Sequence, residues 1–327
     1  MRPYLAVLLA ALLFGTTGTS QALGATDATP ASIGAARILI GGGALALIAA
    51  LVVYRDHRAS AIRGAERSQL LGKAMLVPPV GRVRGRFGLP SWAIVLLGAC
   101  GVLAYQPTFF AGTSQNGVAV GTIVALGSAP IITGACDWAL RRRFPGVIWL
   151  VATVLATVGV VLLSGLTDAG QTTITLSGIL SSLSAGASYA VYTLSGKALL
   201  ERGWSPTAAM GGVFGLAALF SIPLLAATNT AWLATVDGLA MALWLGLVTT
   251  TLAYVLFGWG LKRLAAPTVS TLTLGEPVTA TVLGILILGE QLSATSVVGL
   301  VVLAAGIAVL TVPARLLPTG RMQRRFT

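Results

Sequence analysis

The stretch VVGLVVLAAGIAVL, residues 297–310, contains no polar side chain. An α-helix needs about 20 apolar residues to cross a hydrocarbon core roughly 30 Å thick. Blocks of this kind recur along the chain, in which 56% of the 327 residues are hydrophobic and only 9% are charged. Soluble domains carry about 25% charged residues. The sequence therefore predicts an all-α integral membrane protein and excludes a water-soluble particle.

Ten apolar segments are long enough to cross a membrane, and turn residues separate them. The first one also resembles a secretory signal peptide, because Arg2 precedes an apolar run that ends in small residues. The internal repeat described below needs this helix, which favours a retained span. The expected spans are residues 4–22, 31–53, 91–111, 116–138, 146–164, 176–196, 207–227, 238–260, 265–288 and 294–313.

The cations lie almost entirely on one side of this topology. Of the 21 Lys and Arg residues, 20 precede the first span, follow spans 2, 4, 6 or 8, or lie in the C-terminal tail. Because cytoplasmic loops collect Lys and Arg, we expect a multi-pass protein of the inner or plasma membrane with both termini in the cytoplasm. The net charge of +12 then reflects contact with the lipid bilayer, and a nucleic-acid partner is not expected.

The longest loop, residues 54–89, carries eight Lys or Arg against Asp56 and Glu66. We expect a solvated cytoplasmic linker; the alternative is a segment that lies on anionic lipid headgroups. Residues 314–327 form a basic cytoplasmic tail. His57 is the only histidine, so no metal site and no cofactor are expected.

The two halves of the chain resemble each other. Gly159-Val-Val-Leu-Leu163 pairs with Gly306-Ile-Ala-Val-Leu310 at an offset of 147 residues, and Thr29-Pro30 pairs with Ser205-Pro206 at an offset of 176. Residues 1–165 and 176–313 would then each supply five spans. Because five is odd, the second half enters the membrane from the opposite side, which predicts two inverted five-helix repeats around a central cavity with a site near the midplane.

Span 6 carries a stripe of hydroxyl groups on one helical face, at steps of three or four residues. The stripe either packs helices closely or lines the cavity, and both remain open. Its members are Ser177, Ser181, Ser184, Ser188, Tyr192 and Ser195, and Tyr105, Gln106, Tyr189 and Tyr254 are further candidates for a substrate pathway.

Arg37 and Glu276 are charges inside predicted spans, and each would cost roughly 3 kcal/mol at the bilayer centre without a partner or water. They either pair with each other as a structural link or lie on the path of a substrate or proton, in which case Glu276 is the expected proton carrier. Pro277 and Pro130 remove a helical N–H at corresponding repeat positions, which predicts two interrupted helices at the site; simple kinks are the alternative.

The motif Leu274-Gly-Glu-Pro-Val278, followed by Leu286-Ile-Leu-Gly-Glu290, resembles the EamA family of the drug/metabolite transporter superfamily. Residues 128–131, Ser-Ala-Pro-Ile, are its weaker first-half counterpart, and Ala35-Ala-Arg37 is also similar to the family's pattern. The chain departs from it at Arg142 and Arg143, where Gly-Glu often closes span 4. The resemblance implies ten helices around a cavity, alternating access, and export of amino acids, metabolites or drugs.

The leading hypothesis is therefore a secondary transporter that exports a small-molecule substrate. A membrane-embedded enzyme and a non-transporting assembly subunit are the alternatives. The sequence has no G-x-x-x-x-G-K-[ST] loop and no H-E-x-x-H motif, which argues against a nucleotide hydrolase and a metalloprotease. A homodimer is compatible with the sequence, but nothing in it supports one.

Overall fold

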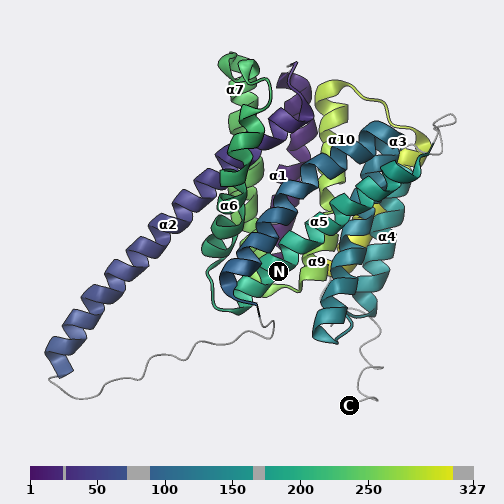
Figure 1. The fold of residues 1–327 in the computed structure, drawn as a ribbon. Coiled ribbons are helices and arrows are strands. Elements are labelled where there is room, and N and C mark those ends of the chain that lie inside the picture. Colours follow the sequence, from purple (N-terminus) through teal and green to yellow (C-terminus); the bar gives the residue numbers. More distant parts are fainter. Residues whose placement is uncertain (25–26, 72–88, 165–173, 312–327) are drawn as a thin grey trace, which may run out of the picture.

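The computed structural model describes residues 1–24, 27–71, 89–164 and 174–311, and all the regular elements in these ranges are helical (Figure 1). This confirms the all-α fold class. The elements are α1 (Arg2–Gly24), α2 (Pro30–Leu71), α3 (Ser91–Arg141), α4 (Val147–Leu163), α5 (Leu176–Glu201), α6 (Pro206–Ala226), η1 (Ala231–Ala234), α7 (Val236–Leu243), η2 (Trp244–Leu252), α8 (Ala253–Arg263), α9 (Ala266–Leu272), α10 (Gly275–Leu288) and α11 (Ala294–Thr311).

These elements follow the order of the predicted spans. Gly117, with φ 80° and ψ 155°, divides α3 into two membrane-length parts. The segments α7–η2–α8 and α9–α10 each form one span. Eight segments of the described chain are long and apolar enough to cross a membrane. The 17-residue α4 and the serine-bearing α5 are the other two predicted spans.

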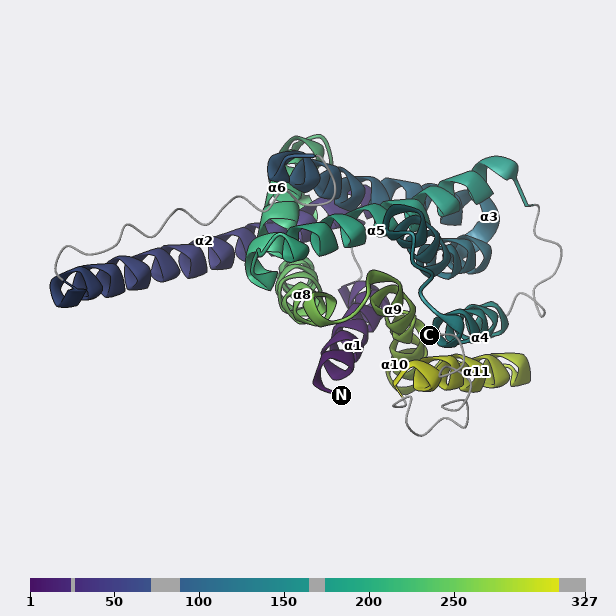
Figure 2. The same ribbon diagram turned by 90° about the horizontal axis from the view of Figure 1, so that it is seen from below.

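The basic loop differs from its prediction. Residues 54–71 continue α2 as a helix that projects from the bundle (Figures 1 and 2). Ala, Arg, Glu, Gln and Leu dominate this stretch, and these residues favour a helix even where nothing packs against it. The rest of the loop, residues 72–88, and the basic tail lie outside the described residues.

Pro130 does not interrupt its helix as expected. Gly117 is the residue within α3 that has non-helical dihedral angles, and the backbone stays helical through Pro130. A proline removes one hydrogen bond, but membrane helices tolerate it where neighbouring groups compensate. In the second half, α9 ends at Leu272 and α10 begins at Gly275, so the interruption near Pro277 is present.

The backbone repeats its features at the offset of 147 residues. Gly117 and Leu264 both end a helix with extended ψ values, 155° and 160°. Arg142 and Gly289 both cap a helix in the left-handed region, with φ 55° and 71°. Glycine adopts this region at little cost, whereas arginine does not. Arg142 therefore keeps the conformation of its counterpart despite the unfavourable side chain.

Corresponding helices of the two halves also pack against each other, α2 with α6 and α4 with α11; Figure 2 shows the latter pair at one edge of the bundle. A Cβ atom on Gly159 would lie 2.6 Å from Leu303 Cα, and one on Gly306 would lie 2.7 Å from the nitrogen of Ala156. Ala156 and Leu303 are also equivalent positions, 147 residues apart in the sequence. Each glycine therefore packs against the equivalent residue of the other half, as a two-fold axis between the halves would require.

Candidate functional site

A cavity of about 1360 Å³ occupies the middle of the bundle and extends to one end of it. Its walls come from α1, α2, α3, α4, α6 and α10. Gln21, Thr29, Ser114, Ser164 and Glu290, all near helix ends, line the open end. This arrangement is typical of a pathway between helix groups and not of a sealed packing defect.

The cavity narrows to an aromatic floor, where a further space of about 70 Å³ adjoins it. The structure brings four predicted site residues together there, Tyr105, Tyr189, Tyr192 and Tyr254, and Gln106 lines both spaces. The hydroxyl of Tyr254 donates to that of Tyr192 at 3.1 Å. Aromatic rings with polar tips suit a wall that contacts both apolar and polar parts of a ligand.

Phe14 and Phe214 complete the floor, and sequence reasoning missed both. The ring centre of Tyr254 lies 5.1 Å from that of Phe14 and 4.0 Å from that of Phe214. A lone phenylalanine in an apolar span carries no signal that distinguishes a cavity wall from packing. The fold alone shows where these rings lie.

Arg37 reaches the floor from α2 and is held in place by η2. Its Nε donates to the Thr250 hydroxyl at 3.0 Å, and its Nη2 donates to the carbonyl of Thr249 at 3.3 Å. The helices cross closely here, since a Cβ on Gly41 would lie 2.5 Å from the carbonyl oxygen of Gly246. The η2 segment is a π-helix, a rare form that often marks functional sites. Its hydroxyl and carbonyl orient the guanidinium, which lines the cavity.

Glu276 lines the same space from the first turn of α10, where the positive end of the helix favours a carboxylate. Pro277 has no N–H to donate to the carbonyl of Thr273, its acceptor in a regular helix. The Glu276 N–H donates to that carbonyl instead, at 3.0 Å. The tighter turn shifts the bond by one residue. The hydroxyl groups of Thr273 and Tyr189 lie 2.8 Å apart, which connects the break to the floor.

Arg37 and Glu276 do not pair with each other. The ion pairs of the described residues are those of Arg141 with Asp137 and with Glu201. The interpretation of Arg37 and Glu276 as a structural ion pair is therefore wrong. Both side chains line the same two spaces, so a cationic and an anionic group face one cavity with capacity for further partners.

The hydroxyl stripe of α5 lies mostly elsewhere. Ser184 is exposed and donates to the carbonyl of Leu180 in its own helix at 2.8 Å. Ser188 is buried, and its backbone carbonyl lies 2.8 Å from where a Cβ on Gly101 would sit. Neither residue is among those that line the cavity. Tyr192, on the same stripe, lines the floor. Helical periodicity placed the stripe on one face but did not show which of its members reach the cavity.

Comparisons with known proteins agree with this geometry. A sequence profile of the EamA-like transporter family matches residues 1–165 and 176–312. The chain belongs to the EamA-like transporter family. It is thus a multi-pass membrane transporter, and the family's name points away from an enzyme.

Two relatives within this group of transporters carry names. The uncharacterized transporter YwfM of Bacillus subtilis is 38% identical over 309 residues, which cover 94% of this chain and 93% of that protein. The threonine/homoserine exporter RhtA of Escherichia coli K12 is 32% identical over 200 residues, 57% of this chain and 64% of its own. A solved crystal structure superposes with a TM-score of 0.70 at 18% identity, covering 95% of this chain and 99% of that one; it supports the fold alone.

Proposed function

We propose that the chain is a secondary exporter of small amino-acid-like solutes that works by alternating access. One observation carries the proposal: Arg37 on α2 and Glu276 on α10 line one cavity without pairing. A guanidinium binds a carboxylate in a bidentate fashion, and a carboxylate attracts an ammonium group. A solute that carries both groups would satisfy both side chains at once.

The aromatic floor supports the same class of substrate. The rings of Tyr105, Tyr254 and Phe214 offer apolar surface to an aliphatic side chain and negative faces to an ammonium group. The name of RhtA, a threonine/homoserine exporter, agrees with substrates of this chemistry and with export. Threonine and homoserine are therefore the first probes to test.

The direction of transport is part of the proposal. The cavity opens at the end that bears Gln21 and Glu290, and the distribution of Lys and Arg predicts that this end lies outside the cell. The structure would then represent the outward-open state, after release of substrate. Glu276, a carboxylate at the break between α9 and α10, is the group through which a proton would be exchanged for substrate.

The test is counterflow in proteoliposomes that contain the purified protein and unlabelled threonine or homoserine. We expect saturable accumulation of labelled substrate, and its loss in both Arg37→Met and Glu276→Gln. The exposed Ser184→Ala variant is the control and should retain flux. An absence of saturable counterflow with any amino acid would refute the proposed substrate class, and unchanged flux in both charge variants would refute the site.

A further inference from the structure

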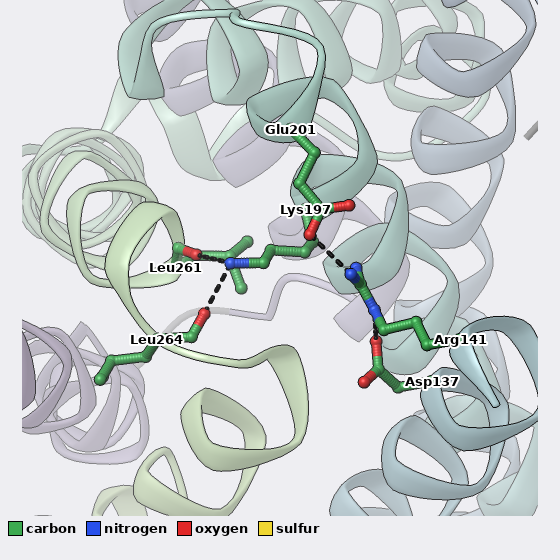
Figure 3. A network of polar contacts seen from close by, with 6 residues as sticks. All are labelled: Asp137, Arg141, Lys197, Glu201, Leu261 and Leu264. Carbon is green, nitrogen blue, oxygen red and sulfur yellow. Dashed lines mark hydrogen bonds and ion pairs between the residues drawn. The ribbon is translucent and has the colours of Figure 1, made fainter. Parts of the chain in front are cut away.

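Lys197, one turn before the end of α5, joins that helix to the end of α8 (Figure 3). Its ammonium group donates to the carbonyl oxygen of Leu261 at 2.9 Å and to that of Leu264 at 2.8 Å. The last carbonyl groups of a helix lack partners within it and form its negative end. Lys197 therefore caps α8 from a different helix with two charge-assisted hydrogen bonds.

The same end of α5 is anchored to α3. Arg141 donates from Nη1 to the Glu201 carboxylate at 2.7 Å and from Nε to the Asp137 carboxylate at 2.5 Å (Figure 3). At the other end of α5, the Asn116 side chain accepts a hydrogen bond from the Thr175 N–H at 2.8 Å. Since α5 is tied to α3 at both ends, these two helices form one unit.

A second unit consists of α1, α8 and α10, because α1 packs against both of the others. Hydrogen bonds join the first unit to the second and to α9, which also packs against α1. Tyr192 on α5 accepts from Tyr254 on α8, and Thr133 on α3 donates to Ser270 on α9 at 3.3 Å. The Lys197 bonds are the outermost of this series, at the end of the bundle opposite the open end of the cavity.

The internal repeat gives Lys197 a counterpart. The offset of 176 residues that pairs Pro30 with Pro206 also pairs Gln21 with Lys197. Gln21 is in the last turn of α1 and lines the open end of the cavity. Its side chain forms no hydrogen bond with any residue in the described part of the chain.

The acceptors of Lys197 have counterparts as well. The offset of 147 residues pairs Leu261 with Ser114 and Leu264 with Gly117. Gly117 and Leu264 are the helix ends with matching ψ values, and Ser114 lines the cavity beside the same open end as Gln21. A donor and its acceptors are thus present at both ends of the pathway, bonded at one end and apart at the other.

We propose that Lys197 with the carbonyls of Leu261 and Leu264, and Gln21 with those of Ser114 and Gly117, are equivalent latches that close opposite ends of the pathway in turn. The structure holds the Lys197 latch closed and the Gln21 latch open. A rocking motion of α3 and α5 against α1, α8 and α10 exchanges the two. This inference rests on the proposed alternating access.

The latches are unequal in strength. Charge-assisted hydrogen bonds are about twice as strong as neutral ones, and lysine supplies a charge where glutamine supplies an amide. The closed Lys197 latch therefore sets the resting state, with the cavity open at the Gln21 end. Adding a positive charge at residue 21 and removing the one at residue 197 should both increase the population of the state that is open at the Lys197 end.

A buried reporter tests the Lys197 latch without any substrate. Thr193 lies one turn from Lys197 toward Tyr189 and is fully buried, so Thr193→Cys would be shielded in the observed state. The full-length protein, with Cys100 and Cys136 replaced by alanine, is labelled in liposomes with a hydrophilic maleimide. We expect Lys197→Met to raise the labelling rate at least tenfold. Lys262→Met, which removes an exposed lysine at the same end of the molecule, should change it less than twofold.

The second reporter is a cross-link at the Gln21 latch. Cysteines at residues 21 and 114 should form a disulfide in low yield under mild oxidation, and Lys197→Met should raise that yield at least threefold. If Lys197→Met increases labelling at residue 193 but not the cross-link, Lys197 is a local cap and the proposal is overturned. Equal labelling rates in Lys197→Met and Lys262→Met would also overturn it.

A gain of charge provides an independent variant should Lys197→Met fail to fold. Gln21→Lys strengthens the Gln21 latch and should increase labelling at residue 193 at least threefold, and an unchanged rate would refute the equivalence. None of these readouts requires flux. A failed counterflow assay with normal shifts in labelling would refute the proposed substrates and leave the latches supported.

Discussion

Thr250 orients Arg37, and its replacement by valine, compared with the same change at Thr251, tests that role. Valine lacks the oxygen that accepts from the Nε atom of Arg37 at 3.0 Å. It keeps the branched shape that packs against Gly41, whose added Cβ would lie 2.5 Å from the Thr250 Cβ. The change therefore removes this hydrogen bond, together with the one that the Thr250 hydroxyl donates to the carbonyl of Leu245 in its own helix at 2.9 Å, while preserving the helix crossing.

The expected effect on substrate affinity follows from the loss of the hydrogen bond between Arg37 and Thr250. A hydrogen bond to a charged group contributes about 1.5–3 kcal/mol, and about 1.4 kcal/mol corresponds to a tenfold change in affinity. The bond from Nη2 to the carbonyl of Thr249 remains, so the guanidinium is loosened and not released. We expect Thr250→Val to raise the KM for an amino-acid substrate about tenfold and to leave the maximal rate within twofold.

Counterflow in proteoliposomes measures both constants, and two variants serve as controls. Thr250→Ser keeps the hydroxyl and should behave as wild type. Thr251→Val removes a neighbouring buried hydroxyl that donates to the Gly41 carbonyl at 3.1 Å, but it leaves Arg37 untouched. The argument fails if Thr250→Val and Thr251→Val raise the KM equally. It also fails if Thr250→Val weakens the corresponding amine, which lacks a carboxylate, as much as the amino acid.

Three further predictions concern the scaffold. Arg142→Gly removes an arginine from the left-handed region, where it costs about 1–2 kcal/mol, and this exceeds the cost of about 0.5–1 kcal/mol for the greater conformational entropy that glycine loses on folding. We therefore expect a higher Tm in detergent for this variant, whereas Arg143→Gly should not raise the Tm. Gly306→Val should lower expression and Tm strongly, because its Cβ would lie 2.7 Å from the backbone of α4; a well-folded variant would contradict the packing. Asp237→Cys should react with an impermeant thiol reagent outside intact cells and Lys262→Cys should not, and the reverse pattern would invert the topology.

The sequence predicts the all-α class and the order of the helices, because both depend on long apolar runs and on turn residues. It predicts Arg37 and Glu276 as neighbours of one cavity because isolated charges in a span need a polar surrounding. Tyr105, Tyr189, Tyr192 and Tyr254 follow for a similar reason, since each hydroxyl group needs a partner or water. These inferences depend only on the chemistry of individual side chains within an apolar span, which the sequence shows directly.

Other features depend on relations between helices. Ser184 follows the periodicity of its neighbours, but it is exposed and bonds within α5, whereas Tyr192 on the same stripe lines the cavity floor. Pro130 and Pro277 are alike in sequence, yet α3 stays helical through Pro130, whereas α9 and α10 are separate helices next to Pro277. Residues 54–71 were expected to be a loop from their charge, although the helix propensity of their side chains favours the continuation of α2.

The reciprocal contact between α4 and α11 has the geometry of a subunit interface within one chain. Gly159 and Gly306 occupy equivalent places on its two sides, and Ala156 and Leu303 do the same. A surface of this kind is self-complementary, so an isolated copy of either half would present a face that fits a second copy of itself. Because the two halves are covalently connected, they always meet each other, and the sequence of each half can change independently. The equivalent positions Ala156 and Leu303 at this interface already differ in this way.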